Sequence, residues 1–299
     1  ICAPYRKYKV CSMPLPSSGG VTLLQILGIL ENFDLSKYPP GTIKTVHLIS
    51  EATRLAYADR NKYLADVAGV PVKKMLDKKY LKSRASLINL GKAAPRVEAG
   101  TFKGYKQKAV INNNAVELPS TTHLSAIDDS GNAVSLTSSI EYYFGFAVDG
   151  FLLNNQLTDF SFLPRIDGKL VANRVSPGKQ PRSSMTPSFV FDENDELLMV
   201  VGSPGGPRII QYTLKAILGY LDWEMDLQQA ISIPNHAILN DVIELEKNTA
   251  IAKLKPRLEE MGHKVRVIDV TSGIHAVVRN NNILKGGADP RRGGAAVGR

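Results

Sequence analysis

Hydrophobic residues follow a helical period through the first third of the chain. Residues 42–64 have apolar residues three or four positions apart, at Val46, Ile49, Ala52 and Ala56, which share one face of a predicted helix. Thr42 is a suitable N-cap for this helix. Residues 21–33 are apolar and lack proline, so they are predicted to form a buried helix, and residues 73–90 are predicted to form one or two short helices. A looser alternation over residues 5–13 indicates a strand.

From residue 121 onward the hydrophobic period changes to two. Leu124 and Ala126 fall on one face of a predicted strand, the turn-forming cluster at residues 129–132 follows, and Val134 and Leu136 continue the alternation. This pattern predicts a β-hairpin that begins almost at Thr121. Further strands are predicted at residues 188–192, 197–201, 264–270 and 273–279.

Helices are also predicted between and after these strands. They cover residues 207–221, 226–233 and 251–261. The order is therefore helices, hairpins, helices and strands, with no internal repeat, which is not the βαβ alternation of a parallel sheet. It predicts an α+β fold with two largely antiparallel sheets covered by helices.

Residues 91–119 differ from both neighbouring regions. They contain scattered lysine, glycine and proline and three successive asparagines at 112–114, with little periodicity, so they are predicted to form an exposed linker. The linker ends two residues before Thr121, with Ser120 between them. If the chain is cut directly before Thr121, the new α-amine, with an ordinary pKa of about 7.7–8, belongs to the same residue as a hydroxyl that it can deprotonate. The ordinary interpretation of Thr121-Thr122 alone is β-propensity.

Seven groups of residues, in order and with matching spacing, resemble the γ-glutamyltranspeptidase family. They are residues 12–20, 121–125, 128–134, 152–160, 181–187 (Pro-Arg-Ser-Ser-Met-Thr-Pro), 202–206 (Gly-Ser-Pro-Gly-Gly) and 287–292 (Gly-Ala-Asp-Pro-Arg-Arg). The resemblance covers nearly all 299 residues. It implies a four-layer αββα sandwich of the N-terminal-nucleophile hydrolase type, made as a precursor (zymogen) that cuts itself between Ser120 and Thr121. Residues 1–120 then resemble the later part of the large subunit and residues 121–299 the small catalytic subunit, together in one structural domain. The N-terminal part of the large subunit is the implied partner.

The resemblance also implies the catalytic residues. Thr121 is the expected nucleophile, and Ser139 matches a position that carries a hydroxyl residue near it. Gly205 and Gly206 precede a predicted helix, where backbone N–H groups can stabilise an oxyanion and a side chain would obstruct the approach. Ser203 lacks the Gly-x-Ser-x-Gly context of a nucleophile elbow.

A γ-glutamyl group carries an ammonium and a carboxylate at its far end. Gln156 and Asp159 resemble the family's ammonium-binding pair, and Ser183 and Ser184 resemble its carboxylate-side donors. Glu141 is a departure, because well-characterised members carry asparagine there. The family's carboxylate-binding arginine is expected in the part that precedes residue 1, and no arginine of this chain is assigned to that role.

The predicted activity is hydrolysis or transfer of γ-glutamyl groups, with glutathione as donor and water or an amine as acceptor. One alternative is a related acylase that acts on another acyl amide, such as a glutaryl-cephalosporin or a polyglutamate. Another is a catalytically inert precursor or fragment. Because Glu141 departs from the family pattern, the acylase alternative stays open. Because the resemblance implies that the N-terminal part of the large subunit is absent, the inert alternative also stays open.

Composition and residue spacing argue against several other classes of protein. The net charge is +9, but Lys and Arg are scattered among Asp and Glu, so nucleic-acid binding is not expected. The five histidines and two cysteines show no metal-binding spacing, so no metal or other cofactor and no disulfide framework are predicted. No run approaches the ~18 apolar residues of a membrane span. Family members are commonly exported, which implies a periplasmic or extracellular location.

Overall fold

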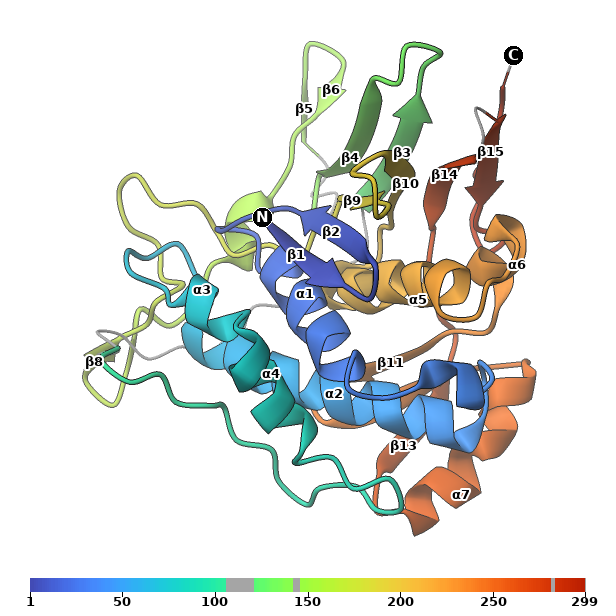
Figure 1. Ribbon diagram of the computed structural model, residues 1–299. Coiled ribbons are helices and arrows are strands. Elements are labelled where there is room, and N and C mark those ends of the chain that lie inside the picture. The colour runs from blue at the N-terminus through green and yellow to red at the C-terminus, as the bar shows by residue number, and fades with distance from the viewer. Residues whose placement is uncertain (106–120, 142–145, 281–282, 299) are drawn as a thin grey trace.

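The computed structural model describes residues 1–105, 121–141, 146–280 and 283–298. An antiparallel sheet in the order β1-β2-β9-β10-β14-β15 forms its centre (Figure 1). The strands are β1 (Cys2–Tyr5), β2 (Tyr8–Ser12), β9 (Ser188–Phe191), β10 (Leu197–Gly202), β14 (His275–Asn280) and β15 (Ile283–Ala288). Because β2 pairs with β9, with Val10 opposite Val190, this sheet joins the two halves of the sequence. The predicted mixed α and β class is therefore confirmed.

The first two strands correct one prediction. Residues 5–13 are not a single strand, because Arg6 has a positive φ of 55° and turns the chain between β1 and β2. Cys2 and Cys11 lie opposite each other in this hairpin and form a disulfide. It is a single cross-strand bond rather than a framework of several bridges.

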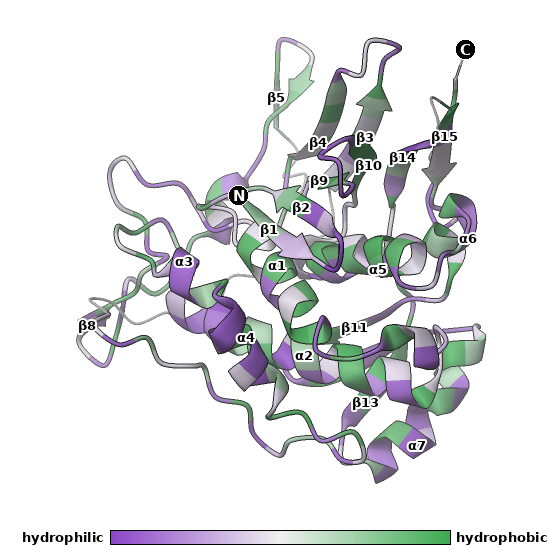
Figure 2. Cartoon of the chain, viewed as in Figure 1, coloured by the Kyte–Doolittle hydropathy of each residue, from purple (hydrophilic) through white to green (hydrophobic). Residues whose placement is uncertain are grey.

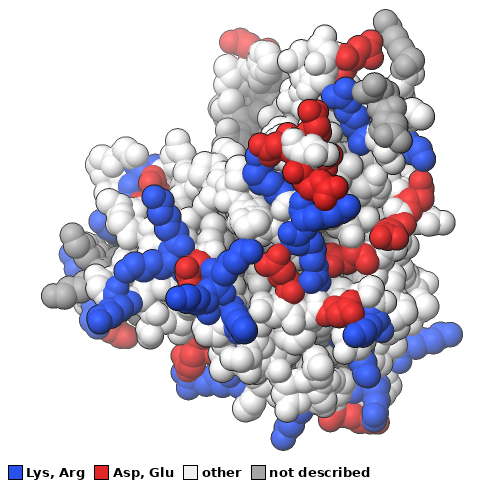
Figure 3. Space-filling model, in the orientation of Figure 1, with Lys and Arg blue, Asp and Glu red and all other residues white. Residues whose placement is uncertain are grey.

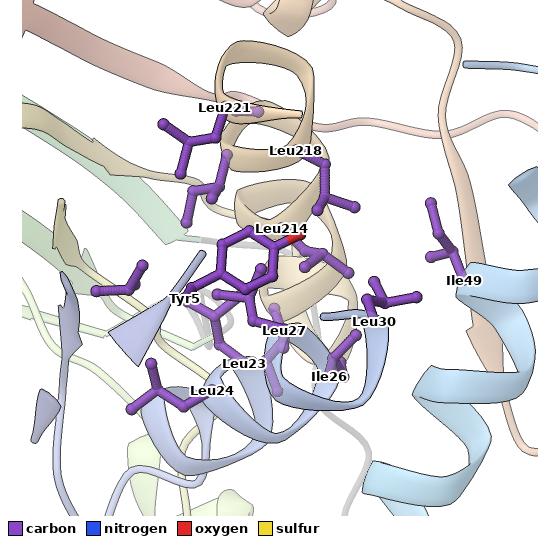
Figure 4. Packing of buried hydrophobic residues seen from close by; sticks show 14 of the residues in the cluster. Tyr5, Leu23, Leu24, Ile26, Leu27, Leu30, Ile49, Leu214, Leu218 and Leu221 are labelled. Atoms are coloured by element: carbon purple, nitrogen blue, oxygen red, sulfur yellow. The ribbon is translucent and has the colours of Figure 1, made fainter. Parts of the chain in front are cut away.

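Helices cover one face of the central sheet. Both α1 (Gly19–Leu30) and α5 (Ile209–Leu221) pack there, and α2 (Ile43–Tyr63) packs on the other side of α1 (Figure 1). Every residue of α1 is buried, which explains why its sequence has no polar face. Figure 4 shows Leu23 and Leu27 of α1 close to Leu214 of α5, and Figure 2 shows how hydrophobic these two helices are. The three helices and the sheet share one hydrophobic core.

The helix ends follow their capping residues. Thr42 caps α2, its hydroxyl oxygen accepting from the backbone N–H of Thr45 at 3.4 Å. Asp77 and Asp226 accept from backbone N–H groups at the starts of their helices in the same way. The shorter helices are α3 (Val72–Met75), α4 (Lys78–Ala85), α6 (Leu227–Ser232) and α7 (Lys255–Glu260). The 3₁₀ turns are η1 (Leu35–Lys37), η2 (Gln156–Asp159), η3 (Gly206–Arg208) and η4 (Ala250–Leu254).

The predicted hairpin at Thr121 covers the opposite face of the sheet. Its strands, β3 (Thr121–Ile127) and β4 (Ala133–Ser139), pack on β10 and β14. The polar side of the hairpin faces the sheet, where Ser125 donates to the carbonyl of His275 and Ser135 to that of Val201. The apolar side faces outward, so that the Leu136 side chain is 51% exposed.

A second small sheet was not predicted in full. It consists of β11 (His236–Leu239), β12 (Val242–Glu246) and β13 (Lys264–Ile268), with β12 and β13 parallel. Of these three, only β13 was predicted, and β15 of the central sheet was missed too. Four two-residue strands form two small hairpins. β5 (Ala147–Val148) pairs with β6 (Phe151–Leu152), and β7 (Arg165–Ile166) pairs with β8 (Lys169–Leu170).

The predicted linker is only partly an exposed loop. Ala93 and Phe102 are buried, and the Phe102 ring packs edge-on against Tyr63. Residues 106–119 of the predicted linker lie outside the described residues. On the face shown in Figure 3, Lys and Arg side chains lie among Asp and Glu. Within the described parts of the chain, no helix combines the length and the apolar character needed to cross a membrane.

Candidate active site

Thr121 is the first residue of β3, and its side chain is buried. Its hydroxyl donates to the hydroxyl oxygen of Ser139 at 3.1 Å, and the two residues lie directly opposite each other in the β3–β4 register. The Ser139 oxygen also accepts from the backbone N–H of Glu141 at 2.8 Å. The Ser139 hydroxyl that bonds to Thr121 is thus itself fixed by the backbone of Glu141.

A small pocket opens beside this pair. It is lined by Thr121, Ser139, Glu141, Gln156, Asp159, Ser183, Ser184, Met185, Gly206 and Ile209. The fold therefore brings together side chains that the sequence separates by up to 88 positions, between Thr121 and Ile209. Among the predicted site residues that the structure describes, Gly205 is the one outside this lining, and it directly precedes Gly206. Ser120 lies outside the described residues.

The Gly205-Gly206 turn connects β10 to η3 and α5. Gly205 has a φ of 140°, and a Cβ there would lie 2.6 Å from the Tyr212 ring, so this position requires glycine. Two contacts hold the residues that follow this turn. The Tyr57 hydroxyl donates to the carbonyl of Pro207 at 2.8 Å. Arg208 forms a bidentate ion pair with the buried Glu244.

Ser203 is fully buried just before this turn. Its hydroxyl donates to the carbonyl of Pro204 at 2.7 Å. Ser203 therefore serves the turn rather than the pocket.

Two carboxylates form one side of the pocket. Glu141 is buried with a positive φ of 63°, and Asp159 is buried in η2, where its carboxylate accepts from the Gln156 amide. The backbone carbonyl of Asp159 accepts from the Asn173 amide at 2.6 Å, and Asn173 accepts from the backbone N–H of Arg182 at 2.9 Å. This side of the pocket is suited to a cation.

Ser183 and Ser184 also line the pocket. The guanidinium of Arg60 on α2 donates to the Ser184 hydroxyl at 2.6 Å and to the Ser18 hydroxyl at 2.8 Å. Ser18 in turn donates to the carbonyl of Ser183 at 2.8 Å. The sequence analysis missed Arg60. The sequence did contain a signal for it. Arg60 lies four positions after Ala56, so it is a charged residue on the helix face that was predicted to be buried.

Arg292 is a second residue that the sequence analysis did not single out. Its guanidinium donates to the backbone carbonyl of Thr121 at 3.1 Å. The available signal was its place in the C-terminal motif at residues 287–292.

A histidine also lies close to Thr121 in the sequence. Burial, together with the neighbouring His275, lowers the pKa of His123 to about 3, so its ring is neutral at physiological pH. The ring bonds to the hydroxyls of Thr137 and Ser125, between the hairpin and the sheet. Within the described residues, no group of three or more His, Cys, Asp or Glu side chains is arranged to bind a metal ion.

Comparison with known proteins gives a consistent result. The family model described as "Gamma-glutamyltranspeptidase" matches residues 1–299. The chain is 37% identical over 314 aligned residues to the glutathione hydrolase proenzyme of Bacillus subtilis, covering 100% of this chain and 52% of that protein. The chain thus spans about half the length of this curated relative.

Solved structures agree. A cephalosporin acylase from Bacillus halodurans superposes with a TM-score of 0.78 at 25% identity, over 97% of this chain and 51% of that one. A T380A mutant of the Helicobacter pylori γ-glutamyltranspeptidase superposes with a TM-score of 0.52 at 35% identity, over 57% of this chain and 100% of that one. With the match of the family model over its whole length, the chain belongs to the γ-glutamyltranspeptidase family.

Proposed function

We propose that the protein hydrolyses or transfers γ-glutamyl groups through Thr121 as an N-terminal nucleophile. The observation that carries the proposal is the Thr121–Ser139 hydroxyl pair at 3.1 Å, beside a pocket that also contains Glu141 and Asp159. The Thr121 hydroxyl attacks the γ-carbonyl carbon while its proton passes to the residue's own α-amine. The C–N bond then breaks, the leaving amine takes that proton, and an acyl ester remains. Water or an amine acceptor attacks this ester and regenerates the hydroxyl.

The pocket has the polarity that a γ-glutamyl donor requires. Glu141, Gln156 and Asp159 would bind the α-ammonium, with the carboxylates supplying the opposite charge. Ser183 and Ser184, the latter bonded to Arg60, would bind the α-carboxylate. Backbone N–H groups at Gly205-Gly206 would stabilise the oxyanion. Glutathione is the donor that we propose.

The same hydroxyl would perform the maturation cut between Ser120 and Thr121. It would leave residues 1–120 as the later part of a large subunit and residues 121–299 as the small subunit. The two would stay together as one structural domain. Support comes from the pairing of β2 with β9 and from a hydrophobic core shared by both segments.

We also propose the four-layer αββα arrangement for the complete protein. The outward side of the β3–β4 hairpin is apolar and exposed, at Leu124, Val134 and Leu136. A further layer from the N-terminal part of the large subunit would cover it. The relatives' greater length is consistent with such a layer. The Cys2–Cys11 disulfide supports a periplasmic or extracellular location, because such bonds persist in oxidising compartments.

A denaturing gel of the complete gene product tests the mechanism. We expect two bands, the smaller of which begins at Thr121 in Edman sequencing. Thr121→Ala should remain a single band without turnover, whereas Thr122→Ala, at the exposed neighbouring position, should mature normally. An intact band in active protein, or activity in Thr121→Ala, would contradict the proposal.

A second assay tests the substrate class against the related acylases. γ-Glutamyl-p-nitroanilide carries the α-ammonium that glutaryl-p-nitroanilide lacks, so the first should react faster. Glu141→Gln should reduce this preference about 10-fold by removing one carboxylate near the ammonium. Glu193→Gln, in an exposed turn, is the matched control. A preference for the glutaryl compound would favour the acylase alternative.

A further inference from the structure

We propose that Arg292 is a positioning residue for the nucleophile: it holds the backbone of Thr121 in place and favours the neutral form of that residue's α-amine. The inference rests on the proposed function of Thr121. It starts from one contact, the 3.1 Å hydrogen bond from the Arg292 guanidinium to the Thr121 carbonyl. The same guanidinium also donates to the carbonyl of Thr271 at 3.2 Å, so it bridges the start of β3 and the segment before β14.

The contact matters because a terminal residue is poorly restrained. Once the bond before Thr121 is cut, the residue is attached covalently through its carbonyl side alone. Its side chain is then oriented by Ser139 and its carbonyl by Arg292. The hydrogen bonds to the side chain and to the carbonyl together fix the position of the Thr121 hydroxyl relative to the α-amine of the same residue. These are the two groups that exchange a proton in the proposed reaction.

Arg292 is itself carried by a fixed segment. The Asp289 carboxylate accepts from the Ser272 hydroxyl at 2.5 Å and from the Arg291 guanidinium at 3.1 Å, and Asp289 is almost completely buried. Arg291 also forms a bidentate pair with Glu246, at 2.6 and 2.9 Å. These bonds fix the backbone next to Arg292 relative to the core. The position of the Arg292 guanidinium at Thr121 is therefore well restrained.

The stem of Arg292 and the ring of Pro204, the residue before Gly205, both lie close to Gly273. A Cβ on Gly273 would lie 2.8 Å from Arg292 Cδ and 2.7 Å from Pro204 Cγ. Glycine at 273 therefore lets the arginine stem and Pro204 approach each other. Arg292 thus bonds to the nucleophile and lies near Pro204, which leads into the proposed oxyanion site.

The electrostatic consequence has a definite sign. A guanidinium bonded to the Thr121 carbonyl lies within about 6 Å of the α-nitrogen of the same residue, which disfavours the ammonium form. Arg60, behind Ser184, adds to this effect, whereas Glu141 and Asp159 in the same pocket oppose it. Removing the Arg292 charge should therefore raise the pKa of the α-amine and reduce the fraction of free base near neutral pH.

The test is the pH profile of kcat/KM with γ-glutamyl-p-nitroanilide, using the matured complete protein. Arg292→Met should raise the apparent pKa of the acid limb by about 0.5 to 1. It should also lower kcat at pH 7 about 10-fold with KM changed less than twofold. Arg292→Lys should retain the parent pKa and recover part of kcat. Arg257→Met, which removes an exposed arginine from α7, is the control and should match the parent throughout.

The outcomes separate this inference from the proposed function. A parent protein without γ-glutamyl turnover contradicts the proposed function. An active parent whose Arg292→Met variant keeps its acid limb and kcat contradicts the inference alone. An equal defect in Arg292→Lys and Arg292→Met also overturns the electrostatic part. If Arg292→Met does not mature, Arg292→Gln and Arg292→Lys are compared in its place, and the same two results decide.

Discussion

Thr121 and Ser139 occupy opposite positions at the open end of the β3–β4 hairpin, with their hydroxyl oxygens 3.1 Å apart. The register thus places a hydroxyl next to the first residue of β3 without any contribution from a loop. Directly opposite residues of an antiparallel pair have Cβ atoms about 4.5–5.5 Å apart, so the backbone pairing keeps these two side chains adjacent.

Ser139→Ala should therefore reduce kcat by about 10- to 100-fold, since it removes the hydrogen bond that orients the Thr121 hydroxyl and leaves the N–H of Glu141 without this acceptor. Ser139→Thr keeps the hydroxyl and should retain most of the activity. Steady-state kinetics with γ-glutamyl-p-nitroanilide measures both. Equal activity in Ser139→Ala and the parent would show that the pair is only structural.

Gly205→Ala should destabilise the protein by about 2–4 kcal/mol, because φ is 140° and the new Cβ meets the buried Tyr212 ring at 2.6 Å. Gly178 is the matched control. It has a φ of 72° with nothing within 4 Å of a Cβ, so Gly178→Ala should cost only about 1 kcal/mol. Urea unfolding gives both values. Equal losses would mean that the Tyr212 contact relaxes freely.

Acid should destabilise the fold through His263. Burial, followed by the neighbouring His47, lowers the pKa of His263 from its ordinary value of 6.5 to about 4, despite the opposing Glu51 and Asp241. Between these two pH values the unfolded chain binds more protons than the folded chain, so stability is complete above pH 6.5 and falls as the pH decreases towards 4. The ring bonds to His47 at 2.7 Å.

His263→Gln keeps a polar partner for His47 and removes the titration. From pH 7.5 to pH 5 the parent should lose about 1–2 kcal/mol more unfolding free energy than this variant. Urea titrations at the two pH values measure the difference. A pH dependence identical to that of the parent would assign the acid sensitivity to other groups, such as His123 and His236, whose pKa values burial lowers in the same direction.

Leu136 tests the proposed additional layer. Its side chain is 51% exposed on the outer side of the hairpin. In the complete protein we expect Leu136→Glu to cost about 2–3 kcal/mol, because a covering layer would bury the new charge. Leu87, at 57% exposed after α4, is the control, and Leu87→Glu should change stability by less than about 0.5 kcal/mol. Similar small effects at both positions would argue against a covering layer.

The sequence predicted the long elements well for a local reason. Helix α1 is a continuous apolar stretch without proline, α2 and α5 have apolar residues at helical steps, and the β3–β4 hairpin has alternation around a turn cluster. Strands β11, β12 and β15 were missed. Among their pairings, only that of β12 with β13, parallel across an intervening helix, joins segments distant in sequence. β11–β12 and β14–β15 are local hairpins, and β15 contains Gly286 and Gly287, a residue type that is depleted in strands.

The sequence by itself placed Thr121 at the start of a predicted strand, because alternation and turn chemistry are local properties. Its proposed role and the site residues around it came from the family resemblance of the motifs. The sequence did not determine the roles of Arg60 and Arg292. The first reaches Ser184 from a position 124 residues away, and the second reaches Thr121 across 171 residues. Only tertiary packing brings residues so far apart in sequence within hydrogen-bond distance, and the buried Arg60 guanidinium also needs the acceptors that the folded chain supplies.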